Sequence, residues 1–296
     1  MDILQYTFFQ NALVGILLIS IVAAIIGSYI VTRRMVFIAG GLTHASFGGL
    51  GIGYFAGISP TLSALIFAII TALGIEFSSR TKRIREDSAI AIFWAIGMAV
   101  GIIFIFLTPG YTPGLSEFLF GNILTITTSD IILFAIYALV LLVYTIWQYR
   151  PILYTAFDTD FARIKGINTR RINTTMMLLI AIGVVLSIRL IGIMLLLSVL
   201  TLPQIIAELF TTRYKYIIWL SGIISLVGSV VGLFASAIIA VPTGACIVVM
   251  MVVMYAIAKG AHMLHQRHIK AVNIRQQEKD NSKKRPETSY PMLLFV

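Results

Sequence analysis

The chain has 296 residues, of which 59% are hydrophobic and 11% are charged, and its formal net charge is +10. A soluble domain carries about 25% charged residues, so this composition excludes a water-facing globular protein of this size. The positive charge does not favour nucleic-acid binding either, because the basic residues lie between long apolar runs and in one tail. The single cysteine, Cys246, excludes an intramolecular disulfide and a thiolate metal cluster.

The apolar runs predict an all-α fold, a polytopic transmembrane helical bundle of about eight to nine spans, because about 20 apolar residues cross a hydrocarbon core. The sixth and seventh spans adjoin at Arg189–Gly192 with hardly any loop, so one of them is expected to be short or broken. The predicted spans are 9–31, 36–57, 60–79, 88–107, 130–148, 174–191, 192–210, 216–240 and 243–262. We interpret 1–265 as the membrane domain and 266–296 as a polar cytoplasmic tail without regular structure.

The basic residues predict the orientation of these spans. If nine spans alternate in direction, the Lys and Arg residues gather on one side of the membrane, and Arg189 is the only one of the 22 that falls toward the other side. Loops that stay in the cytoplasm carry an excess of Lys and Arg. We therefore expect the amino terminus outside, the carboxyl terminus in the cytoplasm, and the lipid bilayer as the surrounding medium.

The second span contains two lines of small residues. Glycine and alanine at intervals of four let helices in lipid approach closely. The first line predicts a face for helix packing and consists of Gly41, Ala45, Gly49, Gly53 and Gly57. The second line consists of Gly40, His44 and Gly48, so His44 projects from a face that other helices or a cavity must cover.

His44 is the candidate functional residue of this span. An ionisable side chain in mid-membrane is costly and is a functional hypothesis by default, and imidazole is a common ligand for transition metals. The alternative is a structural histidine that only joins helices by hydrogen bonds, with Thr43 or Ser46 satisfying its neighbours. The residues alone leave both interpretations open.

Three further segments carry information. Glu86-Asp87-Ser88 suits the start of a helix, because acidic residues favour the positive end of the helix dipole. Residues 117–125 are too short to span and predict an interfacial or re-entrant helix, with Glu117 and Asn122 as vestibule residues. Residues 157–168 predict a short cytoplasmic helix with a cap at Asp158 and a stop at Gly166.

The seventh span contains Pro203, which is expected to break it and free backbone carbonyls. Arg189 and Glu208 flank this span. We expect them near opposite interfaces and therefore not paired with each other.

Several of these pieces, in order over about residues 10–262, resemble the permease subunits of bacterial zinc- and manganese-type metal-ion ABC importers. The pieces are 33–35 with 43–46, 85–92, 119–124, 161–168, 192–203 and 242–244. The resemblance implies a homodimer in the bacterial cytoplasmic membrane that pairs with cytoplasmic ATPase subunits and receives its ion from an extracytoplasmic metal-binding protein. It implies that the chain is not itself an enzyme, holds no permanent cofactor, and moves zinc, manganese or ferrous iron while the partner uses ATP.

The resemblance also implies roles for particular residues. It makes the short cytoplasmic helix a coupling helix for the ATPase, formed by Phe157, Asp158, Phe161, Ala162, Arg163 and Gly166. It places His44 in the translocation path, with Thr43, Ser46, Gly40 and Asn122 beside it. In one respect the chain departs from the family: Gly40 stands where an Asp four residues before the histidine is usual, and Asn122 where an Asp is frequent. Fewer carboxylates weaken a site for a hard cation such as manganese.

Other functions remain as alternatives. An ABC permease for iron chelates or cobalamin is built on similar lines, and a stand-alone secondary transporter would need no docking helix. The chain contains no Gly-x-x-x-x-Gly-Lys-Ser/Thr phosphate-binding motif, so ATP hydrolysis is expected on a separate subunit. An intramembrane enzyme is disfavoured because no second catalytic candidate accompanies His44.

Overall fold

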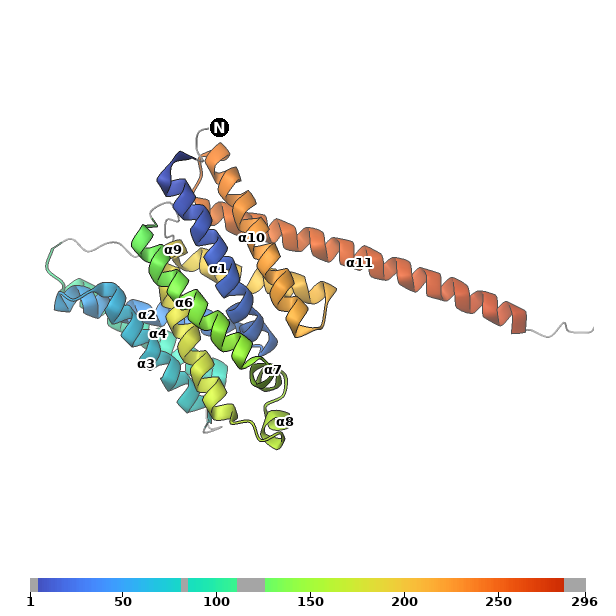
Figure 1. Cartoon of the computed structure of the whole chain (residues 1–296), viewed down its shortest axis with the longest axis horizontal. Coiled ribbons are helices and arrows are strands. Elements are labelled where there is room, and N and C mark those ends of the chain that lie inside the picture. The colour runs from blue at the N-terminus through green and yellow to red at the C-terminus, as the bar shows by residue number, and fades with distance from the viewer. Residues whose placement is uncertain (1–4, 81–84, 111–125, 285–296) are drawn as a thin grey trace, which may run out of the picture. The chain divides into compact units, whose positions relative to one another are not determined.

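The structure, a computed structural model, describes residues 5–80, 85–110 and 126–284, and these ranges contain helices and no strands. This confirms the predicted all-α fold. The helices in chain order (Figure 1) are α1 (Thr7–Thr32), α2 (Val36–Ala56), α3 (Pro60–Arg80), α4 (Glu86–Leu107), α6 (Thr128–Trp147), α7 (Tyr149–Phe157), α8 (Thr159–Ile164), α9 (Thr169–Phe210), α10 (Tyr214–Ile239) and α11 (Thr243–Lys284).

Within the described ranges, eight helices are long and apolar enough to cross a membrane: α1, α2, α3, α4, α6, α9, α10 and α11. The predicted spans fall on these helices, and α9 covers both the sixth and the seventh. Most ends agree within two residues, but α9 begins five residues before the predicted sixth span and α11 continues past the predicted end at 262 to Lys284. The predicted acidic helix start is also present, because Glu86 and Asp87 form the first turn of α4.

α9 is 42 residues long and is interrupted at Gly192, whose backbone angles are φ 74° and ψ 173°. Such angles are accessible almost only to glycine. The interruption lies where the predicted sixth and seventh spans adjoin. The expectation that Pro203 breaks the span is wrong, because the second arm of α9 remains helical through that residue.

The chain reverses at this interruption. Asn173, near the start of α9, accepts a hydrogen bond from Arg33 at the end of α1. Arg189 instead forms an ion pair with Asp130 at the start of α6. Tyr214, which follows α9, again lies against aromatic rings of α7, beyond the end of α6. The two arms of α9 therefore cross the bundle in opposite directions, between what we call the Arg33 end and the Asp130 end.

The helices form two groups joined by α9. α2 packs against α3 and α4, while α1 packs against α6 and α10, and α9 contacts members of both groups (Figure 1). α1 and α10 run antiparallel, because the Ser20 hydroxyl accepts from Ser225 (3.2 Å) and Ser28 lies 3.5 Å from Ser221. α1, α2 and α9 are the most buried spans and make the core.

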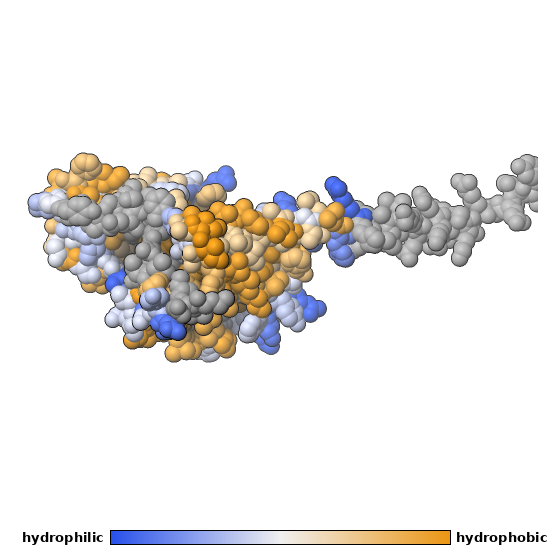
Figure 2. Space-filling view, turned by 90° about the horizontal axis from the view of Figure 1, so that it is seen from above, coloured by the Kyte–Doolittle hydropathy of each residue, from blue (hydrophilic) through white to orange (hydrophobic). Residues whose placement is uncertain are grey.

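Large parts of the face in Figure 2 are apolar, with hydrophilic residues between and beside them. On α6, for example, exposed aliphatic side chains recur at Ile132, Ile136, Leu139 and Val143. Lipid is the solvent that such a surface requires, so these rows support a membrane location.

The internal contacts divide the chain into two units, Met1–Tyr255 and Ala256–Val296. In the second unit the described residues are helical to Lys284. This differs from the expectation of a tail without regular structure from residue 266. Residues 261–285 contain no glycine or proline and many Arg, Gln, Glu and Lys residues, which favour helix.

Candidate functional site

His44 lies in the best-buried part of α2. All residues from Ile38 to Gly49 are buried except His44, which is partly exposed. Its imidazole stacks on the indole ring of Trp94 in α4, with ring centroids 4.3 Å apart and planes inclined by 7°. One face of the imidazole is therefore covered, and the side chain still reaches the surface of this chain.

Close approach of α2 and α4 builds this pair. A Cβ atom added to Gly97 would overlap the backbone of Ala45, and one added to Gly41 would overlap the Ile90 side chain. A Cβ on Gly101 would lie 2.6 Å from the Phe47 carbonyl oxygen. The glycines of both helices thus set their register, and this register places Trp94 opposite His44.

Gly40 differs from the other glycines of α2. A Cβ added there would lie 3.7 Å from Trp94 Cζ3 and 3.8 Å from Leu197 Cδ2, which are ordinary van der Waals contacts. Packing therefore does not require glycine at this position. Leu197 belongs to the second arm of α9, so this arm borders the same face of α2 as Trp94.

The remaining predicted packing glycines fall into two kinds. A Cβ on Gly49 would overlap α3 at Ser63, and a Cβ on Gly53 would lie 2.8 Å from the Pro60 Cα atom. A Cβ added to Gly57 would meet no atom within 4 Å. Gly57 caps α2 in the left-handed conformation, with φ 66°. The prediction that Gly57 belongs to the packing face of α2 is therefore corrected, because the helix ends before this residue.

Thr43 and Ser46 are both fully buried. The Thr43 hydroxyl donates to the Ala39 carbonyl oxygen and the Ser46 hydroxyl to the Thr43 carbonyl oxygen, each at 2.6 Å. Both hydroxyls are thus engaged by the backbone of their own helix rather than directed at His44. Asn122, the other polar candidate for the path, lies outside the described residues, as does Glu117.

Among the residues that the structure describes, no group of three or more His, Cys, Asp or Glu side chains could hold a metal ion. The arrangement can present one imidazole nitrogen to an ion that passes the partly exposed face of α2. A transported ion is a substrate and needs only transient ligands.

The short helix predicted within residues 157–168 is present as α8, at the Arg33 end. Asp158 caps it by accepting from the backbone N–H groups of Asp160 (3.0 Å) and Phe161 (2.9 Å). Gly166 follows its end with φ 76°. Ala162 is fully buried, whereas the apolar side chains of Phe157, Phe161 and Ile164 are exposed. We call these three side chains, Phe157 from the end of α7 and Phe161 and Ile164 from α8, the α8 apolar surface.

Aromatic contacts tie this element to the bundle. The Phe157 ring lies 6.0 Å from that of Tyr214 in α10, and the Phe161 ring lies 5.6 Å from that of Tyr154 in α7. Arg163 forms an exposed ion pair with Asp160 (3.3 Å) and donates from Nε to the Thr169 hydroxyl (3.4 Å). Sequence reasoning found α8 but missed α7, which continues almost directly from α6.

A charged cluster at the Arg33 end was not predicted. Arg33 Nη1 donates to Asn173 Oδ1 (2.6 Å) and to the Tyr29 hydroxyl oxygen (3.1 Å). Burial works against the charge of Arg33, but Tyr29 and the carboxylates of Glu86 and Glu76 outweigh it, so the pKa of Arg33 lies above its ordinary value. Glu76 is itself buried in α3. The cluster links α1, α3, α4 and α9.

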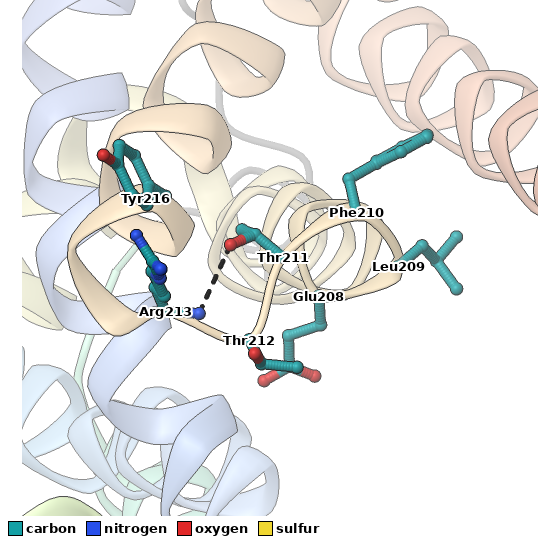
Figure 3. A pocket seen from close by; sticks show the side chains of 7 residues that line it. All are labelled: Glu208, Leu209, Phe210, Thr211, Thr212, Arg213 and Tyr216. Carbon is teal, nitrogen blue, oxygen red and sulfur yellow. Dashed lines mark hydrogen bonds between the residues drawn. The ribbon is translucent and has the colours of Figure 1, made fainter.

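A shallow pocket of about 440 Å³ lies where α9 meets α10 (Figure 3). Within it the Arg213 backbone N–H donates to the Thr211 hydroxyl (3.3 Å). Its lining residues are Glu208, Leu209, Phe210, Thr211, Thr212, Arg213 and Tyr216. The pocket is separate from His44. Glu208 lies in the last turn of α9, close to Tyr214 at the Arg33 end, whereas Arg189 pairs with Asp130 at the other end, so the expected separation of Arg189 and Glu208 is confirmed.

Trp94 is the contact of His44 that sequence reasoning missed. A signal was available, because tryptophan in membrane proteins gathers at the interfaces, whereas Trp94 stands near the middle of α4. A tryptophan at that depth is expected to contact something other than lipid headgroups.

Comparison with known sequences adds three findings. The profile of the ABC 3 transport family matches residues 5–261. The manganese transport system membrane protein MntC of Halalkalibacterium halodurans is 32% identical over 257 residues, which cover 87% of this chain and 88% of that protein. A probable metal transport system membrane protein of Chlamydia trachomatis is 34% identical over 238 residues, 78% of this chain and 81% of that protein.

A solved structure is similar as well. A chain in the structure of PsaBC from Streptococcus pneumoniae in complex with Fab superposes with a TM-score of 0.76 at 28% sequence identity. The match covers 87% of this chain and 93% of that chain.

Proposed function

The chain belongs to the ABC 3 transport family, and we propose that it is the permease subunit of an ATP-binding-cassette importer for divalent metal ions. Manganese is the leading candidate, because the MntC relative carries that ion in its name. Zinc and ferrous iron are the other candidates. The chain is a multi-pass membrane protein and not an enzyme, and ATP hydrolysis belongs to a separate subunit.

The observation that carries the proposal is the placement of His44. A histidine in the middle of a buried, glycine-rich span is costly unless it serves a function. Its partly exposed imidazole, with one face covered by Trp94, offers a nitrogen lone pair to a passing divalent ion. The helices α2, α4 and the second arm of α9 would form the wall of the path around it.

The α8 apolar surface supports the partnership with an ATPase. Phe157 at the end of α7 and Phe161 and Ile164 in α8 are exposed, and Asp158 between the two helices caps α8. The Phe157–Tyr214 contact ties the end of α7 to α10. An apolar surface on a rigid, polar-flanked element is suited to docking in a groove of another protein. Closure of the ATPase subunits would be transmitted through this element to the spans.

The orientation follows from the same end of the molecule. The basic residues that flank helices at the Arg33 end include Arg34, Arg85, Arg150, Arg171 and Lys215, whereas Arg189 lies at the Asp130 end. The bias of Lys and Arg toward the cytoplasm supports a location of the Arg33 end, with α7 and α8, inside the cell. We propose a homodimer of this chain, with the extracytoplasmic metal-binding protein delivering ions at the Asp130 end.

The missing carboxylate bears on the identity of the ion. Gly40 offers no oxygen ligand beside His44. A single imidazole discriminates less between zinc, iron and manganese than a site with both nitrogen and oxygen ligands does. A competition panel for uptake through the complete importer, with Mn²⁺, Zn²⁺ and Fe²⁺, tests the choice. Preference for an iron chelate or cobalamin over all three free ions would replace the proposal with its alternative.

The central test is His44→Ala in cells that depend on this importer, with the ATPase and the binding protein present. We expect metal uptake to fall at least tenfold while the complex still assembles, because the only imidazole in that span is lost. The matched control is His262→Ala, a histidine of α11 outside the proposed path. Normal uptake of every divalent ion by the His44 variant would contradict the proposed path.

A further inference from the structure

Trp94 and His44 form a stacked pair inside the membrane-spanning region. Their ring centroids lie 4.3 Å apart and the ring planes are nearly parallel, inclined by 7°. The other two tryptophans of the chain, Trp147 and Trp219, are 77% and 66% exposed and lie near the ends of α6 and α10. Interfacial anchoring explains tryptophans in those places. It does not explain Trp94.

The position of the pair is set by close contact between the backbones of α2 and α4. Gly97 lies one helical turn after Trp94 and packs directly on Ala45, the neighbour of His44. The edge of the same indole, at Cζ3, is 3.7 Å from the position of a Cβ atom on Gly40. Trp94 thus covers a stretch of α2 that extends from Gly40 to His44, and α4 cannot slide past α2 without overlap at Gly97.

A stack of this kind suits a metal ligand. The lone pair of an imidazole nitrogen lies in the ring plane, so an indole on the ring face leaves that nitrogen free. The χ2 angle of an unrestrained histidine covers a broad range, and a parallel indole on the ring face narrows that range. Metal binding also gives the imidazole positive charge, which the electron-rich face of the indole attracts. Groups that orient a ligand in this way commonly govern its affinity for metal.

We propose that Trp94 is a positioning residue for His44: its indole face holds the imidazole plane so that an in-plane nitrogen meets the divalent ion. The proposal rests on the proposed function, because it requires His44 to contact the transported ion. Trp94 itself touches no ion and acts through His44.

The test measures Mn²⁺ uptake kinetics through the assembled importer with Trp94→Phe, Trp94→Leu and Trp94→Ala. We expect the leucine and alanine variants to raise KM roughly three- to tenfold, the size of an aromatic pair interaction, with a smaller change in maximal rate. Trp94→Phe keeps an aromatic face and should stay near the wild-type KM. Trp219→Leu is the matched control, because that indole faces outward.

A second measurement does not depend on uptake. With Trp147 and Trp219 replaced by phenylalanine, Trp94 is the only tryptophan of this chain. The difference in emission from a complex that also carries Trp94→Phe then reports the stack. Mn²⁺ added to the purified complex should change the Trp94 emission, and His44→Ala should abolish the change. Emission that is unaffected by Mn²⁺ in a sample that transports Mn²⁺ would overturn the positioning role.

The outcomes separate the two proposals. If wild-type importer moves no divalent ion, the proposed function fails. If uptake requires His44 but all three Trp94 variants keep the wild-type KM, the positioning role alone fails. A third outcome is that all three variants, including Trp94→Phe, lower the amount of assembled complex but leave KM unchanged. This outcome would show that the indole only packs between the helices, and it also overturns the positioning role.

Discussion

Arg189 and Asp130 join the start of α6 to the turn of α9, with Nε and Oδ1 2.9 Å apart. Asp130 also closes the capping box of α6 with Thr127, and Arg189 donates from Nη1 to the Thr61 hydroxyl at the start of α3 (3.3 Å). Arg189 stands three residues before Gly192, so the contact ties three helices together beside the reversal of the chain.

The first prediction concerns this ion pair. A double-mutant cycle with Arg189→Ala and Asp130→Ala should give a coupling free energy of about 0.5–1 kcal/mol, because the arginine is half exposed and the pair is screened. Thermal unfolding in detergent measures it. Lys215→Ala, at an exposed position at the Arg33 end, is the control and should leave the melting temperature unchanged. Strict additivity of the two substitutions would show that the pair contributes nothing.

The second prediction concerns the reversal of α9 itself. Gly192→Ala should destabilise the protein by about 1–3 kcal/mol, because φ 74° with ψ 173° is strained for any residue with a Cβ atom. Gly260→Ala in α11 is the control, since a Cβ there meets nothing within 4 Å and alanine favours helix. The melting temperatures of the two variants should move in opposite directions. Equal melting temperatures would mean that the turn tolerates side chains.

The third prediction compares two glycines at the seam between α2 and α4. Gly97→Ala should cost about 1–3 kcal/mol, because its methyl group overlaps the Ala45 backbone and the helices must separate. Gly40→Ala places its methyl group in ordinary contact with Trp94 and Leu197 and should cost little. Melting temperature and the yield of intact importer measure both. A larger loss for Gly40→Ala would contradict the seam described above.

The fourth prediction adds the absent carboxylate. Gly40→Asp should be accommodated and should lower the KM for Mn²⁺ uptake several-fold, because a carboxylate oxygen one helical turn from His44 supplies a hard ligand. Gly40→Asn has nearly the same shape without the charge and is the control. If the two variants show the same KM, residue 40 does not face the ion.

The fifth prediction tests the α8 apolar surface. Ile164→Ser should leave the permease folded but reduce co-purification of the ATPase by about tenfold, because a fully desolvated aliphatic contact is lost. Ile238→Ser, at the end of α10, is a matched control, since the two isoleucines are 83% and 84% exposed. Undiminished association after Ile164→Ser would place the ATPase contact elsewhere on the chain.

Local sequence rules predicted the elements well where one rule dominates. Asp158 before a short helix, Gly166 after it, and the acidic start of α4 each follow from the chemistry of helix ends. Regular spacing misled at Gly57, where the same interval of four runs past the end of α2. Pro203 was misread because neighbouring helices stabilise a proline within a membrane helix, and a rule drawn from isolated helices omits them.

The sequence by itself determined that this chain is a many-span helical membrane protein, where most of its spans begin and end, and that His44 is the unusual residue among them. Each of these is set by the local cost of placing a side chain or a helix end in lipid. Only the tertiary structure decided that Trp94 covers His44, that Arg189 pairs with Asp130, and that α9 turns back at Gly192. These contacts depend on how helices distant in sequence pack, and a pattern along one helix does not specify its partner.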